Sequence, residues 1–561
     1  MNTASIMEDY YHLLDNNLVI ERIVHFTGAA LLAAIATSFI YLHQCRSYFY
    51  QIRQDFIAHQ RQRSAENSGT KKKKGKQETN PDDNTFIIGF FHPHCSSGGG
   101  GERVLWKAIQ ALGELKEGKL MDRRSNKSKK KSVLFNTTIT DDDDVRLNNC
   151  KNIMVVIYTV DEPSATYEKE LLKHVQERFS ISIPKSLSLH FVHLHEEKHL
   201  LQLSKKQRFT MMAESYGTMK LAWSALSALT PHVFFDTTGC AFTFVVARIL
   251  AGCKVGAYVH YPTISTDMLS LVWKRRPTYN NDVKVAANPI GTCAKLIYYV
   301  IFAFLYGLVG SLANLVMVNS SWTKQHIQSL WKLCGQVHVV FPPVDTKSLK
   351  LLPLADRENM IMSIGQFRPE KDHTLQLLSF AKLLENNEEM RNSDVKLVLI
   401  GSCRGEDDQQ LVDQLKKLAR ELNIQDHVEF VLNQPYSVLK EYLSRASIGI
   451  HTMWNEHFGI GVVEMMAAGL VTIAHNSGGP ESDIIQSPWN EKTRDYNNCT
   501  GCLASDAEQY ATLMSRILKD GSSSDVSMKI RENGRKHAEQ FSDEVFMNAF
   551  KEALLSSSIL K

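Results

Sequence analysis

Residues 85–103 read TFIIGFFHPHCSSGGGGER: an apolar run, a short polar turn, four glycines and a charged pair. An uninterrupted apolar run of this length is typical of a strand that is buried on both faces. Glycines after such a strand let the backbone turn sharply into a helix, because they lack the Cβ atom that restricts other residues. The stretch therefore predicts a strand, a tight turn and a helix, which is the repeating unit of a parallel α/β sheet.

The same alternation continues along the chain and then restarts. Further strands are predicted at 153–159, 187–194, 232–236, 254–260, 360–364, 395–400, 428–431 and 470–474, and helices at 165–179, 206–229, 373–385, 409–422 and from Gly459 onward. We therefore predict an α/β protein with two Rossmann-like lobes, residues 85–318 and 346–561, joined by a connection over 319–345. Ligands of such sheets bind beyond the carboxyl ends of the strands, so the two lobes are expected to face a ligand-binding cleft.

The segment ahead of the first lobe predicts a membrane anchor. Residues 23–42 read IVHFTGAALLAAIATSFIYL, which is uncharged and long enough to span a bilayer core as a helix. Acidic residues dominate 1–22 and basic residues dominate 43–84, so the positive-inside rule places 1–22 in the lumen and the rest in the cytosol. A cleaved signal peptide is the alternative, and the acidic start disfavours it. Residues 43–84 are predicted to be a flexible basic tether, because 64–84 are polar and lysine-rich.

A second apolar stretch covers residues 294–318, AKLIYYVIFAFLYGLVGSLANLVMV. A second crossing would place the two lobes on opposite sides of the membrane, so we predict a helix that lies in the membrane interface. A buried core helix is the alternative. Residues 119–149 interrupt the alternation with a basic run and four aspartates, and they predict a disordered surface insertion.

Charge and cysteine content exclude some other classes of protein. Sixty-four basic and sixty acidic residues leave a net charge of +4, which is too balanced for a protein whose main partner is nucleic acid. Ten cysteines without a matching second CxxC pair predict neither a zinc site nor a disulfide framework.

Two of the turns at strand ends carry groups suited to phosphate. Gly100 and Gly101 follow the first strand, where the backbone can approach a ligand closely and a helix N-terminus favours an anion. Arg368 and Lys371 follow the strand at 360–364, and two cations there suit a pyrophosphate that gains charge as it leaves. Either feature alone is also compatible with an ordinary turn or with solvated surface charges.

A pair of glutamates and a histidine complete the candidate site. Glu456 and Glu464 lie eight residues apart on either side of the helix start at Gly459. In this arrangement Glu456 can face a sugar while Glu464 accepts from ribose hydroxyls, and the free N–H groups of the helix start can meet phosphate. His260 closes the strand at 254–260 and can hydrogen-bond a substrate across the cleft, although a lone histidine is more often structural.

The order and spacing of these motifs resemble the retaining GT-B glycosyltransferases of family four. Within that group the chain is most similar to the endoplasmic-reticulum α-1,2-mannosyltransferases that extend dolichol-linked oligosaccharide. The segments that carry the resemblance include FFHPHCSSGGGGERVLW (90–106), YGTMKLAW (216–223), FFDTTGCAFT (234–243), YVHYPTISTDML (258–269), FPPVDT (341–346), IGQFRPEKDH (364–373), MWNEHFGIGVVEMMAAG (453–469) and AHNSGGP (474–480). The resemblance covers nearly everything from residue 85 onward except the insertion.

This resemblance implies a retaining hexosyltransferase that uses GDP-mannose as donor. The implied acceptor is the Man3GlcNAc2 glycan on dolichyl pyrophosphate, which receives its fourth and fifth mannoses on the cytosolic face of the endoplasmic reticulum during assembly of the N-glycan precursor. Other mannosyltransferases of the pathway are candidate partners. A transferase of the same fold with another donor or linkage, and a non-catalytic membrane-anchored subunit, remain alternatives.

The resemblance also implies a role for each candidate residue. Glu456 would contact the transferred sugar, Glu464 the ribose, and Arg368 and Lys371 the pyrophosphate, with His260 near the reacting centre. The backbone near the phosphates would come from Gly100, Gly101, Gly459, Gly478 and Gly479. We expect no metal cofactor, because no DxD motif lies where it would hold a nucleotide sugar and the cations can do the same work.

Overall fold

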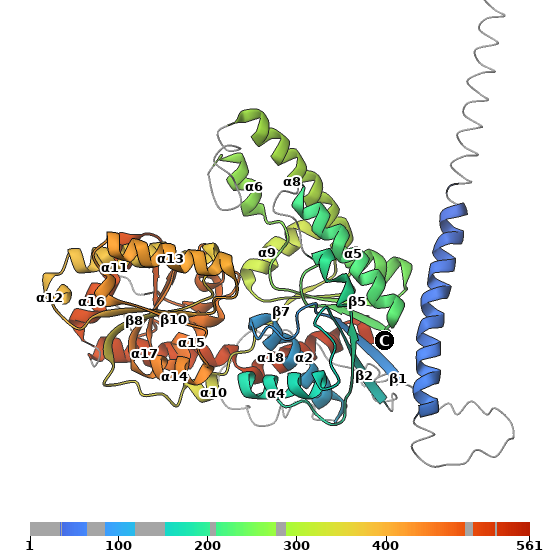
Figure 1. Cartoon of the computed structure of the whole chain (residues 1–561), viewed down its shortest axis with the longest axis horizontal. Helices are drawn as coiled ribbons and strands as arrows, with labels where there is room; N and C mark the ends of the chain where they lie inside the picture. The colour runs from blue at the N-terminus through green and yellow to red at the C-terminus, as the bar shows by residue number, and fades with distance from the viewer. Residues whose placement is uncertain are drawn as a thin grey trace, which may run out of the picture.

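The computed structural model describes residues 34, 36–63, 85–117, 152–201, 209–275, 288–488, 497–521 and 524–560. In this part of the chain two parallel sheets form two lobes that lie side by side (Figure 1). The architecture is the predicted one, with two Rossmann-like α/β lobes.

The first lobe is built on a seven-stranded sheet, among the described residues, with strand order β3-β2-β1-β4-β5-β6-β7. Its strands are β1 (Thr85–Phe91), β2 (Asn152–Thr159), β3 (Ser188–His193), β4 (Val233–Asp236), β5 (Lys254–Val259), β6 (Leu315–Val318) and β7 (Val337–Val339). Neighbouring strands pair in parallel. Strands of a parallel sheet are covered on both faces, which is why β1 reads as an unbroken apolar run.

Helices cover both faces of this sheet. They are α2 (Gly100–Lys116), α4 (Tyr167–Phe179), α5 (Thr210–Ala228), α6 (Thr266–Trp273), α8 (Pro289–Gly310) and α9 (Ser321–Leu330), with the 3-10 helix η2 (Glu196–Leu201) and the π-helix η3 (Val245–Leu250). One hydrophobic cluster contains Phe234 and Trp331, and the other contains Phe90 and Trp106. Successive side chains of the central strands point to opposite faces of the sheet and therefore pack into two separate hydrophobic cores.

The second lobe has a six-stranded sheet in the described residues, with strand order β10-β9-β8-β11-β12-β13. Its strands are β8 (Glu358–Ile364), β9 (Lys396–Gly401), β10 (Val428–Leu432), β11 (Ala446–His451), β12 (Val471–His475) and β13 (Cys502–Ala504). Its helices and short turns are α10 (Thr346–Leu349), η4 (Pro369–Lys371), α11 (His373–Glu385), α12 (Glu388–Arg391), α13 (Glu406–Glu421), η5 (Gln425–His427), α14 (Tyr436–Arg445), α15 (Ile460–Ala468), η6 (Pro480–Ile484), α16 (Ala507–Asp520), α17 (Asp525–Ala538) and η7 (Glu539–Phe541). The carboxyl ends of β8, β9 and β10 open toward the first lobe, as the fold requires of a ligand site.

The predicted membrane helix at 294–318 and the predicted connection at 319–345 are corrected by the structure. The helix α8 ends at Gly310, and the last residues of the apolar stretch form the buried strand β6. The connection contains α9 and β7, which belong to the first lobe. Hydropathy alone does not separate a helix from an adjacent buried strand, because both are apolar throughout.

The end of the chain returns to the first lobe, although we predicted that all of 346–561 belongs to the second. The helix α18 (Asp543–Ser556) and the turn η8 (Ser558–Leu560) bury Phe546, Phe550 and Ile559 in a first-lobe core. Asp543 accepts from Arg103 at 2.8 Å and from Lys107 at 2.9 Å. Figure 1 shows α18 beside α2, so the last helix fastens the lobes together.

Residues 36–63 form one helix at the N-terminal end of the described chain. The predicted anchor at 23–42 lies largely outside the described residues, as do the lumenal segment 1–22, residues 64–84 of the tether, and nearly all of the insertion at 119–149. Residues 43–63 are helical and not a flexible tether: Phe49 and Ile57 are buried, and Arg53 donates to the carbonyl oxygens of Thr230 at 3.2 Å and Pro231 at 2.5 Å. The basic composition of 43–84 favoured a flexible tether, but buried apolar residues such as Phe49 and Ile57 give residues 43–63 a packing face.

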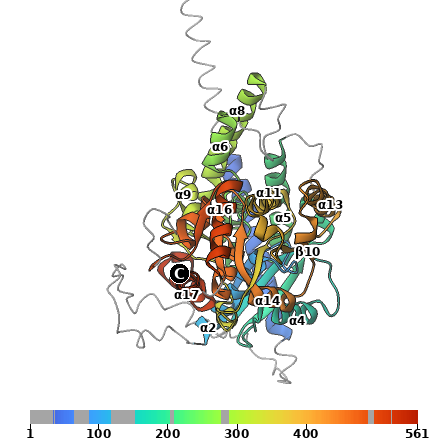
Figure 2. The ribbon, with the colours of Figure 1, turned by 90° about the vertical axis from the view of Figure 1, so that its left-hand side faces the viewer.

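The helix α8 extends away from the sheets together with α6 (Figure 2). Within the described residues it is the one helix that is long and apolar enough to cross a membrane. Its inner face packs closely on the lobe, because a Cβ at Gly307 would lie 2.4 Å from the Leu330 carbonyl oxygen. The outer face leaves a helical stripe of large apolar side chains exposed: Ile297, Ile301, Phe304 and Leu308. The helix is therefore neither a fully buried core helix nor a polar surface helix.

Candidate active site

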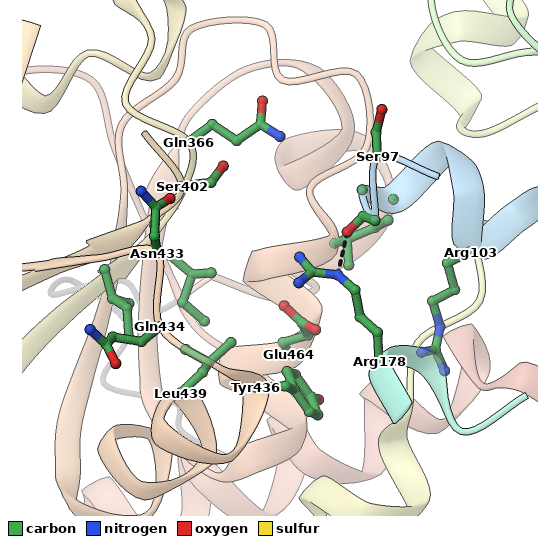
Figure 3. A pocket seen from close by; sticks show the side chains of 18 of the residues that line it. Ser97, Arg103, Arg178, Gln366, Ser402, Asn433, Gln434, Tyr436, Leu439 and Glu464 are labelled. Atoms are coloured by element: carbon green, nitrogen blue, oxygen red, sulfur yellow. Dashed lines mark hydrogen bonds between the residues drawn. The ribbon is translucent and has the colours of Figure 1, made fainter. Parts of the chain in front are cut away.

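A pocket of about 430 Å³ lies between the lobes. Figure 3 shows Ser97 and Arg178 of the first lobe on one side of it, facing Gln366, Ser402, Asn433 and Gln434 of the second. The wall also includes Gly98, Gly99, Gly100, Arg103, Phe179, Ile364, Gly365, Ile400, Gly401, Arg404, Tyr436, Leu439, Ile460 and Glu464. The pocket thus lies beyond the carboxyl ends of the strands, where the sequence predicts a ligand.

The glycine-rich turn brings the two lobes into contact. A Cβ at Gly100 would lie 2.6 Å from the Ile460 Cδ1 atom of the second lobe, so any larger residue at this position would displace the Ile460 side chain. Gly98 has φ +72° and its carbonyl accepts from Arg178 Nε at 2.5 Å. The Glu102 carboxylate accepts from the Gly99 N–H at 2.8 Å and thereby satisfies one amide at the start of α2. Contacts with Arg178 and Glu102 therefore fix the backbone of the glycine-rich turn, where the sequence predicts a phosphate site.

Glu456 and Lys371 are brought together with His451 in one hydrogen-bonded group, in which Glu456 and His451 are buried and Lys371 is half-buried. Lys371 Nζ donates to Glu456 Oε2, and His451 Nε2 lies 3.1 Å from the same oxygen. Burial alone would raise the pKa of the Glu456 carboxyl, but Lys371 and His451 lower it well below its ordinary value. Glu456 is thus an ionised hydrogen-bond acceptor at neutral pH. The Lys371 side chain also lies against Gly365 of the pocket wall, which connects this group to the pocket.

The loop that carries Glu456 is supported from behind by Gly478 and Gly479. The Gly479 N–H donates to the Glu456 carbonyl oxygen at 2.7 Å, and a Cβ at Gly478 would lie 2.4 Å from that oxygen. Gly478 also has φ +65°, which glycine adopts without strain. The Gly479 N–H is therefore already engaged with Glu456, which differs from its expected role as a donor to phosphate.

Glu464 points into the pocket from α15, near Tyr436 (Figure 3). Burial raises the pKa of its carboxyl to about 7, so both the neutral and the ionised form are present near neutral pH. The helix α15 begins after Gly459, whose φ of +108° allows the sharp entry. The arrangement suits hydrogen bonds to ligand hydroxyls at Glu464 and to an anion at the helix start.

Arg368 and His260 belong to different lobes, and neither lines the pocket. Arg368 is exposed, and its guanidinium makes no hydrogen bond or ion pair with the residues that the structure describes. His260 follows β5, and its buried Nε2 has no partner among the described residues. Burial lowers the pKa of its imidazole to about 4, so His260 is neutral at neutral pH. A Cβ at Gly101 would lie 3.6 Å from His260 Nε2, so Gly101 lies next to this imidazole.

Several residues of this site were missed by the sequence analysis. His92 lies beside His260 and Gly101, and its Nδ1 is 2.6 Å from Thr237 Oγ1. Burial lowers the pKa of His92 to about 3. Its position directly after β1 was an available signal. The pocket residues Ser402, Asn433, Gln434 and Tyr436 also follow strands, but single polar residues there do not stand out from ordinary loops.

The comparisons with known proteins cover both lobes. The description "ALG11 mannosyltransferase N-terminus" matches residues 85–136 and 133–331, and "Glycosyl transferases group 1" matches residues 345–537. The proteins named GDP-Man:Man(3)GlcNAc(2)-PP-Dol alpha-1,2-mannosyltransferase are 41% identical in Mus musculus, over 85% of this chain and 87% of the relative, and 40% identical in Dictyostelium discoideum, over 82% and 83%.

Solved structures confirm the fold. The N-terminal domain of Candida albicans trehalose-6-phosphate phosphatase superposes with a TM-score of 0.54 at 11% identity, covering 87% of this chain and 100% of that one. Sucrose-phosphate synthase of Thermosynechococcus elongatus gives 0.53 at 15% identity, covering 83% and 98%. The fold is GT-B, and the chain is a glycosyltransferase that belongs to the family of GDP-Man:Man(3)GlcNAc(2)-PP-Dol alpha-1,2-mannosyltransferases.

Proposed function

We propose that this protein transfers mannose from GDP-mannose to dolichyl-pyrophosphate-linked Man3GlcNAc2, forming the α-1,2 linkages of the fourth and fifth mannoses of the N-glycan precursor. The observation that carries the proposal is the buried Glu456 carboxylate, hydrogen-bonded by Lys371 and His451 beside an interlobe pocket, in a chain 41% identical to enzymes named for this reaction.

The chemistry follows from where charge develops in the transition state. As the sugar leaves GDP, negative charge grows on the pyrophosphate, and groups aimed at that charge lower the barrier. Arg368 and the start of α15 supply positive potential, while Glu456 can accept from a hydroxyl of the mannose. Glu464 is placed to accept from the ribose. Retention would follow a front-face route, in which the leaving phosphate takes the proton of the attacking acceptor hydroxyl.

Transfer is proposed to need no metal ion. The work of a divalent cation is to neutralise the leaving pyrophosphate, and Arg368, Lys371 and the amides at the start of α15 can do this together. Activity in the presence of EDTA is the corresponding expectation.

The enzyme is proposed to work at the cytosolic face of the endoplasmic reticulum membrane, held by a single N-terminal span. The exposed apolar stripe on α8 supports a membrane-facing first lobe, because a surface of this kind is favoured at the boundary between headgroups and acyl chains. A lipid-borne acceptor requires its transferase to work close to the bilayer, and α8 would bring the cleft there.

Two alternative functions can be distinguished from the proposed one by a single transfer experiment. A transferase of this fold could use another donor or form another linkage, since the described pocket walls are compatible with other nucleotide sugars. A non-catalytic subunit is disfavoured, because a scaffold has no need of a buried carboxylate held ionised by a lysine.

The test is transfer from radiolabelled GDP-mannose to lipid-linked Man3GlcNAc2 by detergent-solubilised full-length protein, with EDTA present. We expect a product whose label is released by an α-1,2-mannosidase. UDP-glucose and UDP-N-acetylglucosamine serve as donor controls. No transfer from GDP-mannose, even with magnesium or manganese added, would contradict the proposed donor and acceptor while leaving the fold unaffected.

A further inference from the structure

A side-chain hydrogen bond joins the lobes next to the candidate reaction centre. Asn455 Nδ2 donates to Asp267 Oδ2 at 2.8 Å. Asp267 lies in the first turn of α6 in the first lobe, whereas Asn455 directly precedes Glu456 in the second. Asn455 has φ +52°, a conformation that asparagine tolerates better than most residues. The hydrogen bond to Asp267 is therefore made by a residue whose backbone is in the left-handed conformation, which few side chains tolerate.

Asp267 is itself oriented by a partner on α9. His326 Nε2 lies 3.5 Å from Asp267 Oδ2, and the other ring nitrogen lies 2.9 Å from Thr266 Oγ1. The hydrogen bond to His326 is the largest influence that lowers the pKa of Asp267. Asp267 is thus an ionised acceptor with a fixed direction, which strengthens a hydrogen bond from a neutral amide.

The second lobe and two aromatic rings hold the same loop from other directions. The Asn455 N–H donates to Ser477 Oγ at 2.8 Å, while the Glu456 carbonyl accepts from Gly479. The next residue, His457, stacks on Tyr261 with ring centroids 5.1 Å apart and lies 5.3 Å from Trp322. The main chain of the loop and the Glu456 carboxylate are thus held by the second lobe, whereas the side chains on either side of Glu456, Asn455 and His457, contact the first lobe.

We propose that Asp267 is a positioning residue for sugar transfer: through Asn455 it sets the orientation of Glu456 when the lobes are closed. The inference rests on the proposed function, because it concerns the same reaction centre. The helix α6 packs against α8, whose outer face is apolar. Asp267 therefore lies between the element that would face the lipid-borne acceptor and the carboxylate that would contact the sugar.

The test replaces Asp267 and Asn455 one at a time and then exchanges them. Asn455→Asp places two carboxylates opposite each other, and Asp267→Ala removes the acceptor. For both we expect kcat to fall roughly tenfold or more, because a displacement of the order of 1 Å at the reacting centre has effects of this size. The KM for GDP-mannose should change little, since neither residue lines the pocket. The double variant Asp267→Asn with Asn455→Asp restores one donor and one acceptor, and should recover most of the lost kcat.

Asp483→Ala is the matched control. Its carboxylate accepts from the Ser321 N–H at 2.8 Å, which is another hydrogen bond between the lobes that does not involve residues 455–457. We expect its kcat to stay close to that of the wild type.

Wild-type kcat in Asp267→Ala, equal losses in Asp267→Ala and Asp483→Ala, or a folded double variant without recovery would each overturn the proposal. Failure of the wild type to use GDP-mannose contradicts the proposed function instead, and the same variants are then compared with the donor that the wild type does use.

Discussion

The buried Glu456 carboxylate is hydrogen-bonded by the half-buried Lys371 ammonium and by the buried His451 imidazole. A buried charge without a partner is strongly destabilising, whereas a buried pair with good hydrogen bonds is tolerated. Lys371 therefore keeps Glu456 ionised as well as contributing positive charge to the site. The charge state of Glu456, and with it the proposed sugar transfer, therefore depends on the pairing of Glu456 with Lys371.

Replacing Lys371 by methionine tests this dependence. In Lys371→Met the pKa of Glu456 should rise, because the largest influence that opposes burial is removed. Transfer should fall by about 10²- to 10³-fold, as for the loss of an electrostatic stabiliser. Steady-state kinetics with GDP-mannose provide the measurement.

Lys382→Met is the matched control for Lys371→Met. Lys382 pairs with Glu508 at 2.6 Å on the surface, where solvent screens the attraction between the two charges. Equal activity in the two variants would show that Lys371 has no special role.

The raised pKa of Glu464 leads us to expect that the effect of Glu464→Gln on stability depends on pH. Its carboxyl has a pKa of about 7 in the folded protein, above the ordinary value for glutamate in an unfolded chain. The stability linked to the protonated form is fully present below the unfolded pKa and is lost as the pH rises through about 7. Glutamine does not titrate, so Glu464→Gln should raise Tm relative to the wild type more at pH 8 than at pH 4. A difference in Tm that is the same at both pH values would contradict this assignment.

Among the elements, α8 has one side that packs on the first lobe and an opposite side that is apolar and exposed. Tyr299, Phe302 and Tyr306 pack into a first-lobe core, whereas Ile301 and Phe304 are 53% and 65% exposed. Exposed large apolar residues at helical spacing form a patch, and patches of this kind mark interaction surfaces. For this chain the proposed surface is the bilayer that carries the acceptor.

Substituting aspartate on the outer face of α8 tests this proposal. Ile301→Asp should raise the KM for an acceptor embedded in vesicles while leaving the KM for GDP-mannose unchanged, because burial of such a side chain contributes about 1.5–3 kcal/mol. Leu351→Asp, at an equally apolar exposed position in the second lobe, is the control and should change neither constant. If both variants behave alike, α8 does not contact the membrane.

At the scale of the whole molecule, the last helix holds the lobes together. Phe550 of α18 is buried in the first-lobe core although the chain reaches it only after completing the second lobe. Phe550→Ala should destabilise the protein by about 3–5 kcal/mol, measured by denaturant unfolding. Val545→Ala, on the exposed side of the same helix, should change the stability by about 0.5 kcal/mol or less. A small effect of Phe550→Ala would mean that α18 is not part of the first-lobe core.

Much of the fold and part of the site could be predicted from local patterns. Buried parallel strands read as apolar runs, and the turns after them carry Gly100, Arg368, Lys371 and Glu464 at positions that the α/β rule assigns to ligands. Both lobes and their order were therefore available from the sequence, because each of these signals is contained within a few neighbouring residues.

Other features were decided only by tertiary structure. The return of α18 to the first lobe, the docking of residues 43–63 and the change from helix to strand after α8 all depend on which surfaces are buried. The contacts of His451 with Glu456 and of Asp267 with Asn455 join residues whose partners no local pattern identifies. Periodicity and turn chemistry act over a few residues, whereas burial and charge pairing depend on the folded chain, so the sequence determined the elements and their order while the tertiary structure decided the partners.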